Sequence, residues 1–111
     1  MPIANCYLNN CSITNTKADA IANEWAGIIN VDIKDVCLSF INIQYQAGRQ
    51  YRCLSRLYLP SLWQQQQVEK IQMSLQQVLT RHLELKPAEI FIITSIINSG
   101  HVVEDGKIIH W

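Results

Sequence analysis

Residues 90–97 read IFIITSII, and this stretch is the most strand-like segment of the chain. Nearly all of its residues are β-branched or aromatic, and such residues are enriched in β-strands. A second stretch of the same kind, VCLSFINI, occupies residues 36–43. Each stretch follows a segment whose apolar residues recur at helical spacing, and a strand reached from an earlier one through a helix runs parallel to it. The two stretches therefore predict parallel strands that helices cover.

Each of these stretches closes a strand-helix-strand pattern. In the first half, residues 3–8 predict a short strand, and a helix is expected to begin near residue 15. In the second half, residues 53–59 predict a strand, Pro60-Ser61 closes it, and the next helix ends at Lys86-Pro87. The inward stripe of this second helix is expected to contain Val68, Ile71, Leu75, Val78, Leu79, His82 and Leu83.

The two halves, about 1–50 and 51–111, repeat the same order of elements. Tyr7-Leu8 falls on Tyr58-Leu59 when the halves are aligned. The repeat predicts an α+β fold, a tandem βαβ-βαβ chain with a four-stranded mixed sheet and both helices on one face. Residues 107–111 predict a short final strand after the turn at Asp105-Gly106. The bare face of such a sheet needs a partner, and self-association supplies one.

The composition restricts the class of protein. A length of 111 residues is typical of one domain, so a single domain over 1–111 is expected. Nine basic and nine acidic side chains give no net charge, so no basic field is expected to hold nucleic acid. No run approaches the ~20 apolar residues that cross a bilayer, and the first residues lack a secretory-signal pattern. We therefore expect a cytoplasmic protein without a membrane contact.

The four cysteines do not form a recognisable metal or redox motif. Cys6, Cys11, Cys37 and Cys53 contain no CxxC pair and no matching histidine spacing. Cys6, Cys37 and Cys53 lie in strand patterns and are expected to be reduced and buried. No metal is therefore predicted.

The repeat and the first residues together resemble the tautomerase superfamily. The resemblance is carried by MPIA at residues 1–4, by the strand at 36–43 with Gln46-Ala47-Gly48 behind it, and by the strand at 90–97 followed by VVEDG at 102–106. It implies a homotrimer whose sheets pack into a barrel, and a proline that becomes N-terminal once the initiator methionine is removed. It implies no organic cofactor.

Pro2 is the residue on which the chemistry of this resemblance depends. A secondary amine at a chain end has a free lone pair, and burial with cationic neighbours lowers its pKa from the α-amino range toward neutrality. Such a group can take a proton from carbon beside a carbonyl and return it elsewhere. The resemblance thus implies a small keto, enol or unsaturated carboxylic acid as substrate, with Pro2 as general base or acid.

The partners that family members place around this proline are largely replaced here. Where short 4-oxalocrotonate tautomerases carry an arginine, this chain has Cys37 and Phe91, and where the cis-3-chloroacrylic acid dehalogenases carry a histidine it has Trp25. Glu104 falls where that second group carries a water-activating glutamate. We therefore take Pro2, Arg56 and Glu104 as catalytic candidates. The substrate-binding candidates are Arg49, Arg52, Phe91 and Trp25.

Two alternatives remain open. The missing partners allow a tautomerase-fold trimer that has lost its catalysis and acts as a binding or structural protein. The element order also allows a ferredoxin-like module that binds RNA or a small effector, although the strand at 53–58 lacks the aromatic and basic pattern expected for RNA.

Overall fold

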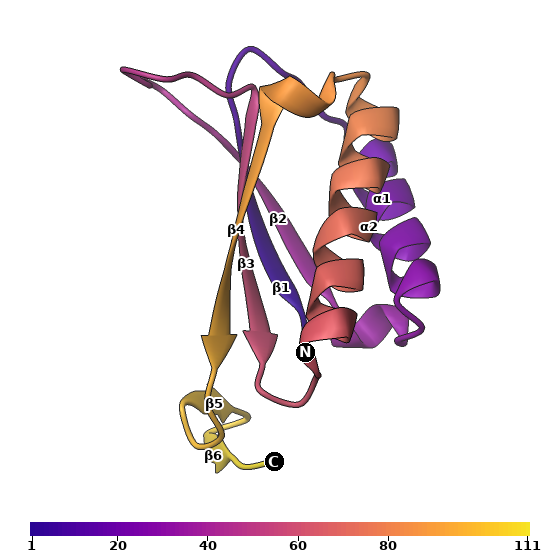
Figure 1. The fold of residues 1–111 in the computed structure, drawn as a ribbon, viewed down its shortest axis with the longest axis vertical. Helices are drawn as coiled ribbons and strands as arrows, with labels where there is room; N and C mark the ends of the chain where they lie inside the picture. The colour runs from indigo at the N-terminus through magenta and orange to yellow at the C-terminus, as the bar shows by residue number, and fades with distance from the viewer.

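The predicted tandem βαβ order is confirmed in the computed structural model, which describes residues 1–111 (Figure 1). A short 3-10 turn precedes β2 (Ile33–Asp35) and another precedes β4 (Pro87–Glu89). The main elements are β1 (Ile3–Leu8), α1 (Asn15–Ile28), β2 (Cys37–Asn42), β3 (Cys53–Pro60), α2 (Gln65–Leu83), β4 (Ile90–Ile97), β5 (Val102–Glu104) and β6 (Lys107–Ile109).

The first four strands form one mixed sheet in the order β2-β1-β3-β4. β1 pairs with β2 and β3 pairs with β4 in parallel, while β1 and β3 are antiparallel at the centre. Both helices cover the same face of this sheet, as predicted (Figure 1). A ferredoxin-like module splits each βαβ unit by inserting a strand between its two strands. Here each unit keeps its two strands adjacent, so the ferredoxin-like alternative is wrong.

The core lies between the sheet and the two helices. Every second residue of β1 points toward the helices, because successive side chains of a strand alternate between its faces. α2 contributes the predicted stripe, of which Leu75, Val78 and Leu79 are fully buried. His82 departs from that stripe: its side chain keeps 22% of its surface exposed and lies 3.1 Å from the Glu24 carboxylate of α1.

The ends of the helices depend on local capping. α1 begins where the Thr14 hydroxyl accepts a hydrogen bond from the Lys17 amide. α2 begins at Gln65, four residues later than the end of the predicted strand-closing dipeptide, because the Gln64 amide donates to the Gln67 side chain and the Gln64 backbone carbonyl accepts from the Gln67 amide. Pro60 is the last residue of β3 and pairs with Ile97, so the strand is one residue longer than predicted.

The C-terminal residues form a small hairpin beyond the end of β4 (Figure 1). β5 and β6 are antiparallel, and the positive φ angles of Asp105 and Gly106 make the tight turn between them. The sequence predicted the turn and the last strand but not β5. Trp111 closes the chain: its amide donates to the Ser99 hydroxyl and its indole N–H donates to the Ser61 hydroxyl.

No element of the chain covers the face of the sheet opposite the helices (Figure 1). We call it the open face. It displays alternate residues of all four strands, of which Ile41, Phe91 and Ile93 are among the exposed large apolar side chains. Cys37 also lies here and is exposed, so the prediction that it is buried is wrong. Neither helix is both long and apolar enough to span a membrane.

Candidate active site

Pro2 lies at the start of the central strand β1 and is fully buried. Its carbonyl accepts a hydrogen bond from the Cys37 amide at 3.0 Å, which extends the β1–β2 ladder by one residue. Because Pro2 and Ala4 are two residues apart, the proline ring lies on the helix-covered side of the sheet. Its nitrogen is joined to Met1, which is 44% exposed. Pro2 is thus held rigidly at one end of the sheet, with its nitrogen toward the surface.

Arg56 lies in the middle of the open face. It pairs across the antiparallel ladder with Asn5, and its guanidinium carbon lies 5.7 Å from the centre of the Tyr7 ring. Asn5 is three residues from Pro2, so alternation places Arg56 and the Pro2 ring on opposite faces of the sheet. Within one chain the two side chains therefore cannot act on the same substrate atom.

Arg49 and Phe91 lie at the other end of the sheet and are joined by Tyr51. The Arg49 guanidinium carbon lies 5.0 Å from the centre of the Tyr51 ring, and the Tyr51 and Phe91 rings lie 5.1 Å apart. We call these three residues the arginine-aromatic cluster. Tyr51 was missed in the sequence, although an aromatic residue between two arginines is a usable signal for such a stack.

Arg52 is occupied in holding loops together. Its guanidinium donates to the Asn10 carbonyl and lies 3.5 Å from the Glu89 carboxylate. The Lys86 amide donates to Glu89 and lowers the pKa of that carboxyl, and Arg52 lowers it further. The Arg52 carbonyl accepts from the Asn9 amide, so Arg52 is level with a residue seven places beyond Pro2. At roughly 3.3 Å per residue the separation along the sheet is about 23 Å.

Glu104 and Trp25 occupy very different environments. Glu104 is exposed at the tip of the C-terminal hairpin, where it pairs with Lys107. Trp25 is fully buried between the helices and the sheet, and its indole N–H donates to the Ile71 carbonyl at 3.3 Å. A substrate therefore reaches Glu104 freely and does not reach Trp25.

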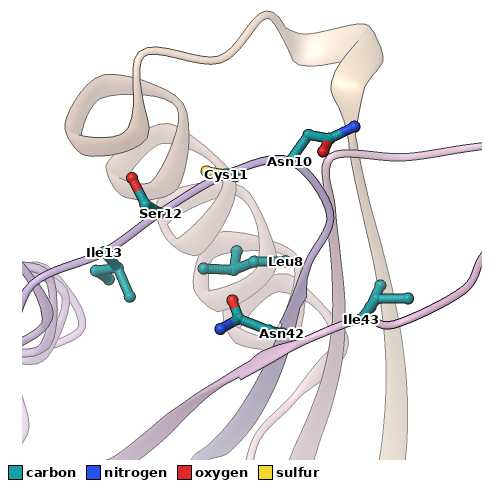
Figure 2. Close-up of a pocket in the computed structure, with 7 residues that line it drawn as sticks. All are labelled: Leu8, Asn10, Cys11, Ser12, Ile13, Asn42 and Ile43. Carbon is teal, nitrogen blue, oxygen red and sulfur yellow. The ribbon is translucent and has the colours of Figure 1, made fainter.

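Three of the surface cavities of the chain lie at three different places. Figure 2 shows one of about 470 Å³ beneath the loop from β1 to α1, at the end of the sheet opposite Pro2. A second, of about 340 Å³, lies where α1 ends and α2 begins, at the same end as Pro2, and its lining includes Trp63 and Lys70. The third, of about 390 Å³, lies on the open face beside Arg56. Pro2 itself lines none of them.

Two of the four thiols are sealed in the core. Cys6 and Cys53 are fully buried, and the Ser55 hydroxyl lies between them and donates to the Cys6 sulfur at 3.2 Å. The hydrogen bond with Cys53 and burial both raise the pKa of the Cys6 thiol. These thiols pack the sheet against the helices and have no access to a substrate.

The chain was compared with other proteins by sequence and by structure. No family model and no curated protein matches the sequence. An R7 fused 4-OT, solved as an asymmetric wild-type trimer, is 12% identical with a TM-score of 0.78 over 96% of this chain and 94% of its own. N1, a member of the cis-3-chloroacrylic acid dehalogenase family, is 17% identical with a TM-score of 0.76 over 96% of this chain and 82% of its own. Macrophage migration inhibitory factor from Toxoplasma gondii is 12% identical with a TM-score of 0.68 over 95% and 97%.

These structures show which fold this is: the chain has the fold of the tautomerase superfamily, as the sequence resemblance predicted. The likeness extends over nearly the whole chain, and it includes both βαβ units.

Proposed function

We propose that this protein is a tautomerase-type enzyme in which Pro2, once N-terminal, acts as general base or acid on a small keto, enol or unsaturated carboxylic acid. The observation that carries the proposal is the position of Pro2, fully buried at the start of the central strand of a tautomerase fold. The hydrogen bond from the Cys37 amide holds the Pro2 carbonyl in the β1–β2 ladder. Because the proline ring is rigid, its nitrogen then points in one fixed direction, away from that ladder.

The chemistry requires removal of Met1. The bond to Met1 makes the Pro2 nitrogen an amide, which has no basic lone pair. Cleavage converts it to a secondary amine with an ordinary pKa of about 8, and its buried surroundings favour the neutral form. For a keto substrate, the amine removes a proton from the carbon beside the carbonyl, and the resulting enolate takes a proton on oxygen to give the enol. Ketonisation of an enol runs the same steps in reverse, so that one hydrogen moves and no other bond is broken.

The substrate carboxylate needs a cation, which we propose a neighbouring copy supplies. In one chain Arg52 lies about 23 Å along the sheet from Pro2, and Arg56 points to the other face. A homotrimer that buries the open face can bring the arginine-aromatic cluster of one copy against Pro2 of the next. Arg49 then orients the carboxylate and Phe91 covers the substrate, while Arg52 anchors the loop that holds Arg49.

Glu104 has a separate place in this proposal. Its carboxylate is exposed on a hairpin that projects from the same end of the sheet as Pro2 (Figure 1). An exposed acid there can activate water for addition to an unsaturated acid, with Pro2 protonated as the general acid. Trp25 takes no part, because its ring lies in the core.

The test combines intact mass with turnover. We expect the mature protein to lack one methionine and to ketonise an enol such as phenylenolpyruvate. Pro2→Ala should lower kcat/KM by at least about 100-fold, the usual contribution of a general base. Pro87→Ala, which changes an exposed proline at the opposite end of the sheet, should keep most of the activity. Equal turnover of the wild type and Pro2→Ala would refute the proposal.

The arginines of one chain lie far from Pro2 or on the other face of the sheet, and this favours a second candidate function. A tautomerase-fold trimer that retains Met1 would have no basic nitrogen and would act as a binding or structural protein. A retained methionine in the intact mass, together with absent turnover, identifies this second function.

A further inference from the structure

The open face carries a single charged side chain, Arg56. Its strands otherwise display apolar groups, hydroxyls, one thiol and one amide, and no acid. The residues that share this face are Ile3, Asn5, Tyr7, Cys37, Ser39, Ile41, Leu54, Arg56, Tyr58, Phe91, Ile93 and Ser95.

Arg56 has no ionic partner in the chain. The ion pairs of the protein involve Arg52, Arg81 and His82, and the contact of Arg56 is with the face of the Tyr7 ring. A ring face attracts the cation but accepts none of its five N–H donors in the plane of the guanidinium. These donors are therefore free toward the solvent side of the sheet.

A cavity beside Arg56 adds polar groups of matching chemistry. It has a volume of about 390 Å³, and its wall includes the Tyr58 and Ser95 side chains. Tyr58 follows Arg56 by two residues on β3, and Ser95 pairs with Tyr58 across the ladder to β4. Their hydroxyls thus lie on the same face as the guanidinium and can donate to one bound group. The remaining lining, from Leu54, Phe91 and Ile93, is apolar.

When copies assemble through the open face, the unpaired Arg56 is buried and needs an anion. The reasoning rests on the proposed self-association through the open face. A guanidinium that loses water without gaining an anion strongly destabilises the contact that buries it. Copies that meet through open faces bring more arginines together and no carboxylate. The charge must therefore be balanced from outside the contacting faces.

We propose that Arg56, with the hydroxyls of Tyr58 and Ser95, binds a small multiply charged oxyanion, a phosphate or a polycarboxylate, and that this anion stabilises the trimer. A planar guanidinium binds two oxygens of one such group in parallel, which favours oxyanions over halides. The site is distinct from the Pro2 site, because Arg56 and the Pro2 ring lie on opposite faces of the sheet.

The experiment measures the dissociation constant of the trimer by sedimentation. The wild type, Arg56→Gln and the control Lys17→Gln are compared in sodium chloride, sodium phosphate and sodium citrate at equal ionic strength. Each anion that binds the assembled trimer and not the free chain should, at about ten times its own Kd, lower the dissociation constant of the wild-type trimer about tenfold. Lys17→Gln, which removes an equal charge from an exposed position on α1, on the helix-covered side, should respond like the wild type. Arg56→Gln should not respond. A response to citrate alone identifies a polycarboxylate site, and a response to phosphate alone identifies a phosphate site.

Two results would overturn this inference while the proposed assembly stands: a wild-type trimer equally stable in all three salts, or an Arg56→Gln trimer that responds like the wild type. A chain that stays monomeric in every salt overturns the assembly and the anion site together. Loss of turnover in Pro2→Ala is measured separately and bears only on the proposed enzyme. Far-UV circular dichroism confirms that each variant is folded.

Discussion

Replacement of Trp25 by phenylalanine tests whether this residue serves the core or a site. The substitution removes the hydrogen bond from the indole N–H to the Ile71 carbonyl, worth about 1 kcal/mol. It also removes roughly 40 Å² of buried ring surface, worth about 1 kcal/mol at ~25 cal/mol per Å². The Ile71 carbonyl keeps its bond from the Ser74 hydroxyl, so no buried acceptor is left without a partner. The expected loss is about 2 kcal/mol, which lowers Tm by about 8 °C in a domain of this size.

The assay is urea and thermal unfolding followed by far-UV circular dichroism at one fixed protein concentration. Trp111→Phe is the matched control, because it removes an indole hydrogen bond to Ser61 at the surface, and we expect it to change stability by less than about 0.5 kcal/mol. If Trp25→Phe left stability unchanged and instead raised the KM for an enol substrate, the assignment of Trp25 to the core would be refuted.

Three further predictions concern acid stability, thiol access and assembly. The pKa of Glu89 is lowered, first by the hydrogen bond from the Lys86 amide. The ionised carboxylate therefore contributes fully to folding stability above its ordinary pKa of 4.5, and this contribution is lost as the pH falls through the lowered folded-state pKa. Glu89→Gln should therefore flatten the fall in urea midpoint as the pH falls below 4.5, and an unchanged slope would contradict this. Cys6 and Cys53 should stay unreactive toward Ellman's reagent until urea unfolds the chain, since both are 0% exposed, and rapid labelling of either in native protein would show that the core opens. Ile93→Lys places a second cation beside Arg56 on the open face and should raise the trimer dissociation constant at least about tenfold in sedimentation, whereas an unchanged dissociation constant would mean that another surface mediates assembly.

The sequence predicted the strands and helices well where the pattern of apolar residues agrees with the position of the turn residues. The strands at 3–8 and 90–97 have the predicted bounds, because alternation of burial and adjacent turn residues mark both ends. The start of α2 was less predictable, since glutamine is an unusual capping residue and the cap depends on the pair Gln64 and Gln67. β5 was missed because three residues carry too little pattern to mark a strand.

The candidate site could be predicted only in part, because it depends on register. Strand alternation shows that Arg56 and Tyr58 share a face, but only the β1–β3 pairing reveals that this face is opposite the Pro2 ring. The loop between β2 and β3 is long, so no turn geometry in the sequence fixes that pairing. Trp25 was ambiguous for a different reason: helical spacing indicates an inward residue, and the same spacing is compatible with a pocket wall.

The antiparallel meeting of β1 and β3 gives the sheet an internal twofold axis that passes between Asn5 and Arg56. The backbone at the two ends is therefore nearly interchangeable, yet a polypeptide has only one beginning. The position equivalent to Pro2 in the second half is Cys53, whose nitrogen is an internal amide. Duplication of a βαβ unit within one chain thus leaves one end able to carry a terminal amine and frees the other to diverge. In the proposed trimer, ends that carry Pro2 would alternate with ends that carry Cys53, so only one end of each sheet could carry the proposed amine.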